Sequence, residues 1–278
     1  MNSHIKNRKL RIRSFRNKLL VSGKIPNRFD GKESVDWTGR GSSERKDSAG
    51  TQIFLRGNSM QSLEPYLKST YYFDHDSEGV KKFLETHTTS ENSPLEKLKE
   101  FYLGVRDGIR YNPYQVTDSK EAYKASSIAQ SRQNYCIPKS ILFAAGARAL
   151  GFPSKIGFSD VVNHLASERL IRHLGTTVFA FHGYAEILIE GNWVKATPVF
   201  DKELCIRFGV VPLDFDGKND TIFHSFDGAG KKFMEYVNHR GVFEDFPFEF
   251  VIQGLKDFYP NVMGKAFQGD LRNEKPVA

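Results

Sequence analysis

One apolar segment constrains the fold of this chain more than any other feature: it begins at Cys136 and closes at Gly151. Its apolar positions are Ile137, Ile141, Leu142, Phe143, Ala144, Ala145, Ala147 and Leu150. Because these positions fall on nearly every side of a helix, the pattern predicts a helix that is buried in a core. Pro138 is tolerated only in a first helical turn, so Cys136 lies at the helix start. Gly151, with Pro153 just beyond it, is typical of a helix end.

The clearest strand pattern follows, between residues 179 and 189, where the side chains alternate with the period of a β-strand. Phe179, Phe181, Gly183, Ala185, Ile187 and Ile189 share one face, and Ala180, His182, Tyr184, Glu186 and Leu188 share the other. Glu190-Gly191-Asn192 predicts a turn, and residues 193 to 197 predict the returning strand. The sequence therefore places His182 on a β-hairpin.

Other segments predict a mixture of helices and hairpins. Ser93-Pro94 is typical of a helix start, and the apolar positions beyond it predict a helix that stops near Pro113. We further expect a helix from Ser77 to His87, a strand from Lys155 to Phe158, a loop from Asp160 to Ser167, a turn from Asp214 to Gly217, a helix near Gly230 to Tyr236, and an aromatic run (Phe243, Phe246, Phe248, Phe250) packed against the body. Because helices come first and hairpins later, the predicted fold class is α+β rather than a parallel sheet.

Length and charge set further limits. With 278 residues the chain can bury a sizeable core. No apolar run approaches the roughly 20 residues that a membrane helix needs, so a membrane span is excluded. Nine Lys or Arg and no carboxylate lie between Met1 and Phe29; removing nine charges from the net +7 leaves −2 for the remainder. Residues 1–60 are predicted to form a basic, loosely ordered arm. A contact with an acidic partner and an organelle transit peptide are the sharper alternatives.

The chain has only two cysteines, Cys136 and Cys205, which make neither a disulfide framework nor a zinc spacing. This usage fits a reducing, cytoplasmic compartment, although organelle import through the basic arm stays open. At a helix start, the dipole is expected to lower the pKa of the Cys136 thiol, and a nearby His182 would activate it as a nucleophile. The alternative is that Cys136 is simply packed and that Tyr184 or Glu186 satisfies His182.

Taken together, these motifs match one family. The matching residues are Cys136, the helix end Ala149-Leu150-Gly151-Phe152-Pro153, the His-x-aromatic-x-Glu pattern of His182, Tyr184 and Glu186, and Trp193. In this order they resemble the transglutaminase-like core, which belongs with the papain-like cysteine enzymes. The resemblance is strongest over residues 94–202.

The resemblance implies a papain-like α+β domain over residues 61–278, with a C-terminal extension at 203–278. In it the helix carrying Cys136 packs on an antiparallel sheet carrying His182. It also implies cysteine-dependent acyl transfer on peptide or carboxamide bonds through a thioester, ending in hydrolysis or in transfer to an amine. The substrate would be a peptide or protein carrying an amide, and neither a metal nor an organic cofactor is needed.

The third catalytic position departs from the family pattern, which has Asp four residues after the Trp. That position here is Thr197, which supplies no charge to an imidazolium. If Gly191-Asn192 is a two-residue turn, Asp201 falls opposite His182 and becomes the candidate orienting residue, with Thr197 as its rival. The alternative is that Asp201 only ends a strand.

Two further hypotheses follow from the residues. Gln133, three positions before Cys136, is a candidate side-chain donor to an oxyanion, beside the backbone N–H at the helix start. The missing family Asp motivates an alternative function, a catalytically inactive transglutaminase-like module that binds protein partners. Nucleic-acid binding through the basic arm is a third alternative.

Overall fold

The computed structural model describes residues 44–46, 52–56, 59–164, 166–223, 233–260, 262 and 269–275. The chain divides into two compact units, Met1–Gly41 and Ser42–Ala278, and every described residue belongs to the second. The basic stretch between Met1 and Phe29 therefore lies outside the described residues. None of the described helices is long and apolar enough to cross a membrane.

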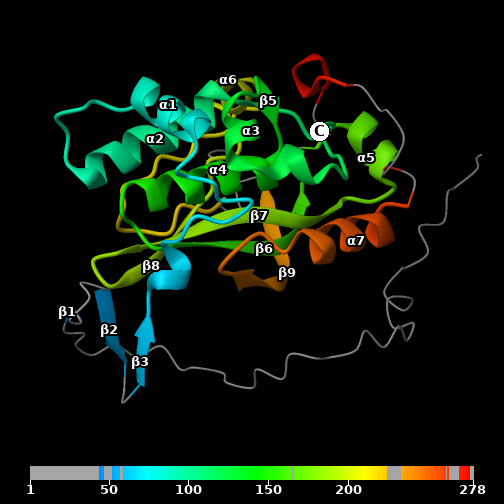
Figure 1. The fold of residues 1–278 in the computed structure, drawn as a ribbon. Coiled ribbons are helices and arrows are strands. Elements are labelled where there is room, and N and C mark those ends of the chain that lie inside the picture. The colour runs from blue at the N-terminus through cyan, green and yellow to red at the C-terminus, as the bar shows by residue number, and fades with distance from the viewer. Residues whose placement is uncertain are drawn as a thin grey trace, which may run out of the picture. The chain divides into compact units, whose positions relative to one another are not determined.

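The centre of the second unit is a four-stranded sheet with the order β8-β7-β6-β9 (Figure 1). Its strands are β6 (Ser154–Asn163), β7 (Val178–Ile189), β8 (Asn192–Ala196) and β9 (Met234–Phe243). All three pairings are antiparallel. Helices precede most of these strands along the chain, so the predicted α+β class with an antiparallel sheet is confirmed.

The predicted buried helix is α4 (Cys136–Ala149), which packs on β7 and β6. On its other side lie α1 (Glu78–His87), α2 (Pro94–Gly108) and α3 (Ala125–Ala129), so α4 is enclosed between a sheet and a helical layer (Figure 1). This enclosure explains why its sequence is apolar all round. α4 ends as predicted, with Gly151 in the left-handed region at φ +85°.

Local capping chemistry fixes the starts of α1 and α2. The Ser77 side chain accepts the Val80 N–H at the start of α1, and the Ser93 side chain accepts the Glu96 N–H at the start of α2. Both predicted helix starts are therefore confirmed. α2 ends at Gly108, earlier than predicted, because after Ile109 the chain enters β4 (Arg110–Tyr111), which pairs in parallel with β5 (Gln133–Asn134).

Two predictions beyond the core need correction, and a third is confirmed. The strand expected at Lys155–Phe158 continues to Asn163, because β6 pairs with β7 on one side and β9 on the other. The described part of the helix expected near residues 230–236 is instead the start of β9. The aromatic run packs back as expected. Phe246 and Phe248 are buried, and the ring of Phe250 on α7 (Phe248–Phe258), although 46% exposed, lies 5.5 Å from that of Phe181 and 5.7 Å from that of Phe243.

The remaining elements are shorter or lie at the ends of the described chain. They are β1 (Glu44–Lys46), β2 (Gln52–Arg56) and β3 (Ser59–Ser62), which form a small antiparallel sheet, the 3-10 helices η1 (Glu64–Tyr66), η2 (Lys120–Tyr123) and η3 (Leu271–Asn273), and the helices α5 (Glu168–Leu174), α6 (Lys202–Arg207) and α7 (Phe248–Phe258).

Candidate active site

Cys136 is the first residue of α4, and this end of the helix is docked directly on β7. A Cβ atom added to Gly183 would stand 3.1 Å from the Ile137 Cα, so a larger residue here would push the strand and the helix apart by a few tenths of an ångström. The Ser140 hydroxyl donates to the Gly183 carbonyl at 3.0 Å and fixes the contact. Because Gly183 directly follows His182, the docking brings the two predicted residues to the same place in the fold.

Cys136 and His182 line one cavity of about 60 Å³. Most of its walls are aliphatic or aromatic, contributed by Tyr111, Pro113, Val116, Tyr135, Ile137, Val161, Leu170, Leu174, Phe179, Ala180, Phe181, Phe200, Met234, Leu255 and Tyr259. The remaining lining residue, Asn163, is the last residue of β6. The candidate nucleophile and base therefore meet in a largely apolar space.

The Cys136 thiol is half-buried, and its protonation differs from the prediction. Burial raises the pKa of Cys136 to about 11, although the backbone N–H groups of Gly183, Ile137 and Cys136 itself act in the opposite direction. The expectation that the helix start would lower this pKa is therefore wrong. Three N–H groups do not compensate for the loss of water around a thiolate in an apolar cavity.

Aromatic rings explain why burial dominates at the thiol. A negative charge on Cys136 adds to burial in raising the pKa of five tyrosines, Tyr111, Tyr123, Tyr135, Tyr236 and Tyr259. The thiol is thus surrounded by neutral phenols. Only Tyr135 could have been suspected from the sequence, because it adjoins the cysteine; the others reach the site through tertiary packing.

His182 is 5% exposed, and its ring lies near the rings of Phe223 (5.6 Å) and Tyr236 (6.2 Å). Burial lowers its pKa to about 4, so the imidazole is neutral near pH 7. Its Nε2 has no hydrogen-bond partner among the described residues. Glu186, one of the partners considered for it, pairs instead with Lys155 at 3.0 Å.

The basis for placing Asp201 beside His182 is wrong. Ile189 pairs with Asn192, so the turn is Glu190-Gly191, and the ladder between β7 and β8 ends at Ala196. Glu190 and Gly191 both have positive φ (47° and 84°), as a tight hairpin turn of this kind requires. The one-residue difference shifts the pairing, and Asp201 leaves the sheet altogether.

Asp201 instead caps α6, where its Oδ1 accepts the Leu204 N–H at 3.1 Å. Its Oδ2 accepts the Tyr111 N–H at 2.8 Å and pairs with Arg272 at 2.6 Å. His182 is not among these partners. Asp201 thus joins α6 and η3 to Tyr111, a residue of the cavity wall.

The two other candidates also lie apart from the imidazole. Thr197 is 1% exposed and its Oγ1 has no partner in the described part of the chain, so no hydrogen bond joins it to the equally unpaired His182 Nε2. Gln133 lies outside the lining of the thiol cavity, and its Oε1 accepts from the Asn112 amide at 3.2 Å.

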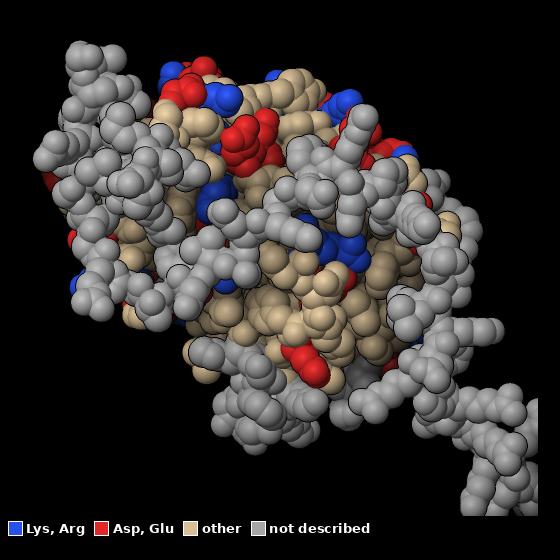
Figure 2. Space-filling view, turned by 90° about the horizontal axis from the view of Figure 1, so that it is seen from below, with Lys and Arg blue, Asp and Glu red and all other residues tan. Residues whose placement is uncertain are grey.

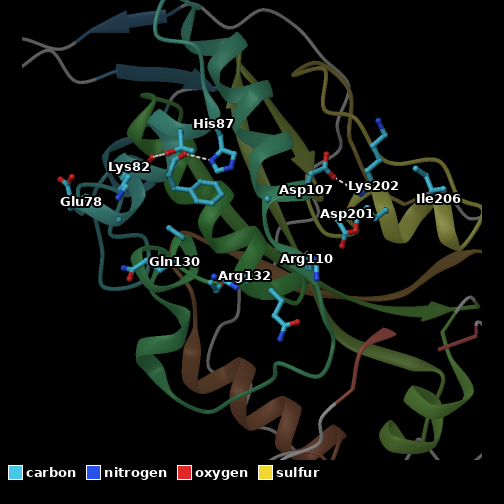
Figure 3. A pocket seen from close by; sticks show the side chains of 18 residues that line it. Glu78, Lys82, His87, Asp107, Arg110, Gln130, Arg132, Asp201, Lys202 and Ile206 are labelled. Atoms are coloured by element: carbon cyan, nitrogen blue, oxygen red, sulfur yellow. Dashed lines mark hydrogen bonds between the residues drawn. The ribbon is translucent and has the colours of Figure 1, made fainter. Parts of the chain in front are cut away.

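A second, larger cavity of about 1580 Å³ is lined by α1, α3, α6 and the end of α2 (Figure 3). Its walls carry both charges, among them Lys82, Arg110, Asp107 and Asp201, and Asp107 accepts the Lys202 N–H at 2.9 Å. Neither Cys136 nor His182 lines it. Figure 2 likewise shows Lys and Arg interspersed with Asp and Glu rather than gathered by sign. Within the described ranges, no group of three or more His, Cys, Asp or Glu side chains could hold a metal ion.

Comparison with known families places the thiol cavity in context. Residues 81–198 match the model of the transglutaminase-like superfamily, a segment that includes Cys136, His182 and Thr197. Over this segment the chain is similar to the transglutaminase-like superfamily, and the observed α+β fold, with a helix packed on an antiparallel sheet, is the one that the resemblance implies.

Two solved structures are similar to the chain. One, a protein of Cytophaga hutchinsonii proposed to be a cysteine protease, has 14% identity and a TM-score of 0.37 over 85% of this chain and 81% of its own. The other, the arylamine N-acetyltransferase of Mycobacterium abscessus, has 19% identity and a TM-score of 0.34 over 48% of this chain and 46% of its own. No curated protein matches the sequence.

Proposed function

We propose that the chain is a cysteine-dependent acyl-transfer enzyme acting on peptide or carboxamide bonds. The observation that carries the proposal is the shared cavity of Cys136 and His182, at a helix start docked on the strand that bears the imidazole. The superfamily match of residues 81–198 supports the same chemistry. Nucleophile and base on adjacent elements are the minimum that thioester formation requires.

The pKa directions support one course for the first step. Burial raises the pKa of Cys136 and lowers that of His182, so the resting pair is a neutral thiol and a neutral imidazole. His182 takes the thiol proton as the sulfur bonds to the carbonyl carbon, and then gives this proton to the departing amine. Water or a second amine attacks the thioester, returns a proton through His182 and releases the thiol.

The backbone N–H groups at the sulfur supply the donors for this step. Those of Gly183 and Ile137 favour the thiolate form of Cys136 and are part of the framework, so they need no reorganisation when negative charge develops. Asp201 has a different role in this proposal. It holds the Tyr111 backbone, and hence one wall of the cavity, through the hydrogen bond to the Tyr111 N–H.

Trapping of the acyl-enzyme tests the proposal. The full chain is mixed with p-nitrophenyl acetate, or with a glutamine-containing peptide and a fluorescent primary amine, quenched in acid and mapped by mass spectrometry. We expect an acyl group on Cys136 that disappears in Cys136→Ala. Cys205→Ser is the matched control, because Cys205 is 2% exposed and lies outside the cavity. Acylation confined to Cys205, or none with either donor, would refute the enzyme.

Thiol reactivity gives a second, independent measurement. With the pKa of Cys136 raised to about 11, alkylation by iodoacetamide should keep rising with pH through 10 instead of levelling off near the ~8.5 of a free thiol. A rate that reaches its plateau below pH 8 would show that the thiolate is already stabilised in the free protein.

The second candidate function is an inactive transglutaminase-like module that binds protein partners. Thr197 in the family's Asp position, together with an imidazole whose Nε2 has no partner among the described residues, favours it. The two candidates separate cleanly. The module predicts that Cys136→Ala leaves every partner interaction intact and that wild type forms no acyl-enzyme.

The remaining assignments are part of the same proposal. The domain spans residues 61–278, with its core near 94–202 and a C-terminal extension at 203–278. Within residues 1–60, the basic stretch between Met1 and Phe29 contacts an acidic partner, and β1 to β3 link it to the domain. The substrate is a peptide or protein carrying an amide, and the protein works in the cytoplasm. Deletion of residues 1–29 should remove any salt-sensitive binding to acidic polymers and leave acylation of Cys136 unchanged.

A further inference from the structure

The residue before His182 has an unusual backbone conformation. Phe181 has a φ of +58°, in the left-handed region that bulky side chains rarely adopt. It lies at an irregularity of the sheet: Ser159 pairs with His182 and Val161 pairs with Phe179, so the register shifts around Asp160. Unusual backbone geometry of this kind persists only where the surroundings hold it in place.

Asp160 holds it. The Asp160 side chain is on β6, is nearly buried, and accepts the Phe181 N–H through Oδ1 at 3.1 Å. Arg240 of β9 donates to the same oxygen at 2.5 Å, and the Asn238 amide donates to Oδ2 at 3.1 Å. Two residues of β9 therefore hold the Asp160 carboxylate in place, and this carboxylate holds the irregular backbone at Phe181.

The Phe181 ring is held as firmly as its backbone. The Arg240 guanidinium lies over the ring, 4.1 Å from its centre, so one arginine contacts both the carboxylate and the ring. Helix α7 packs against the same ring: a Cβ atom added to Gly254 would stand 2.3 Å from a carbon of the Phe181 ring. Glycine at this position lets α7 close over the ring.

Apart from the ring contacts with Phe223 and Tyr236, the direction of the His182 side chain depends on the backbone that carries it. Its Nε2 has no hydrogen-bond partner among the described residues, and the family's orienting Asp is replaced by Thr197. Upstream, the Ala180 N–H donates to the Tyr259 hydroxyl at 2.6 Å, so the backbone is pinned on both residues before the histidine. The direction of the His182 Cα–Cβ bond then follows from the φ of Phe181.

We propose that Asp160 is a positioning residue, which orients the His182 imidazole toward Cys136 by holding Phe181 in the left-handed conformation. The inference rests on the proposed acyl-transfer function. In this inference, backbone geometry orients the imidazole, the role that the family pattern gives to an Asp carboxylate. A misplacement of about 1 Å at a reacting group lowers a rate on the order of 100-fold.

The test is a double-mutant cycle between residues 160 and 181. In Asp160→Ala, Phe181 loses the acceptor of its N–H and relaxes, and acylation of Cys136 by p-nitrophenyl acetate should fall roughly tenfold to 100-fold in kcat, with little change in KM. Glycine adopts positive φ without penalty. In the Phe181→Gly background, Asp160→Ala should therefore lower the rate by less than about threefold. Equal losses in both backgrounds would mean that Asp160 serves only the fold, and would overturn the inference.

Two further variants guard against a change that merely destabilises the sheet. Asp160→Asn keeps an oxygen for the Phe181 N–H and should retain a rate near wild type; a loss as large as that of Asp160→Ala would overturn the inference. Asn238→Ala removes the bond to Oδ2 only. This matched control should leave the rate unchanged.

A readout without activity separates this inference from the proposed function. The imidazole carbon and proton resonances of His182, assigned by their loss in His182→Gln, should move in Asp160→Ala and stay in place in Asp160→Asn. If neither acyl donor modifies Cys136 in the wild-type protein but the resonances follow this pattern, the positioning role of Asp160 stands and the proposed enzymatic function is refuted. Resonances that stay in place in Asp160→Ala would overturn the positioning, whatever the activity.

Discussion

Two helix starts in this molecule are built in opposite ways. α4 begins at Cys136 behind Tyr135, which provides no side-chain cap, whereas α6 begins behind Asp201, whose carboxylate accepts the Leu204 N–H. The first helix directs backbone N–H groups at a thiol in an apolar cavity. At the start of α6, side-chain oxygens already accept the backbone N–H groups: Asp107 accepts that of Lys202, and Asp201 accepts that of Leu204 and also pairs with Arg272.

The difference shows which helix start is available for chemistry. Helix-start N–H groups left without a side-chain cap can stabilise charge that develops during a reaction. A capped start contributes stability instead. Cys136 and Asp201 were both candidates for catalysis from the sequence. Their surroundings separate them: Asp201 is tied into structural contacts, and Cys136 is the position to which the proposed function assigns the chemistry.

The largest effect should come from removing the base at the reactive helix start. In His182→Ala the proton of Cys136 has no nearby acceptor, so the rate of acyl-enzyme formation should fall by a factor of about 10² to 10⁴. Stopped-flow release of p-nitrophenol measures it. His239→Ala is the control, because His239 is exposed and its ring nitrogen makes a long, 3.5 Å contact with the Tyr184 hydroxyl. A fall below fivefold would remove His182 from the mechanism.

At the capped helix start the effect should be on stability. Asp201→Ala removes the cap of α6, the acceptor of the Tyr111 N–H and the partner of Arg272 together. Breaking a buried pair of this kind lowers the free energy of unfolding by about 3 kcal/mol, measurable by urea denaturation. Glu203→Ala is the matched control, because Glu203 is exposed and lies 3.9 Å from the same arginine. If Asp201→Ala instead left stability intact and shifted the pKa of His182, Asp201 would be the orienting residue after all.

These two helix starts also show how far sequence could lead. The start signal at Ser93-Pro94, the glycine at residue 151 and the alternation along β7 are local signals, and each predicted its element. The juxtaposition of Cys136 and His182 follows from a buried helix and a hairpin that share one core. Local chemistry thus located both candidate residues.

What sequence could not provide depends on long-range contacts. A hairpin turn misplaced by one residue moved Asp201 from beside His182 to the start of a helix, because every residue of the returning strand changes its partner. The raised pKa of Cys136 results from tertiary burial, which no helix-start argument contains. The bulge at Phe181 is held by Asp160, 21 residues earlier, and no local pattern predicts that pairing.

Acid should affect the reactive region through His182. Burial lowers its folded-state pKa to about 4 from 6.5, so between these values the unfolded chain binds more protons. The free energy of unfolding should therefore fall as the pH drops from about 6.5 to about 4, by about 3 kcal/mol, and level off below. His182→Gln, which does not titrate, should lose this contribution when urea midpoints are compared across pH. Identical pH profiles for the two proteins would place the imidazole in contact with water.

The smallest effect should come from Thr197, the residue in the family's Asp position. Its Oγ1 is buried without a partner among the described residues, so Thr197→Val removes an unsatisfied hydroxyl at nearly constant volume. Stability should stay constant or rise by about 1 kcal/mol. Because no hydrogen bond joins Thr197 to His182, acylation should stay within about threefold of wild type. A tenfold loss of rate with unchanged stability would instead make Thr197 the orienting partner of the imidazole. The site at the uncapped start of α4 would then depend on a side chain, as the capped start of α6 depends on Asp201.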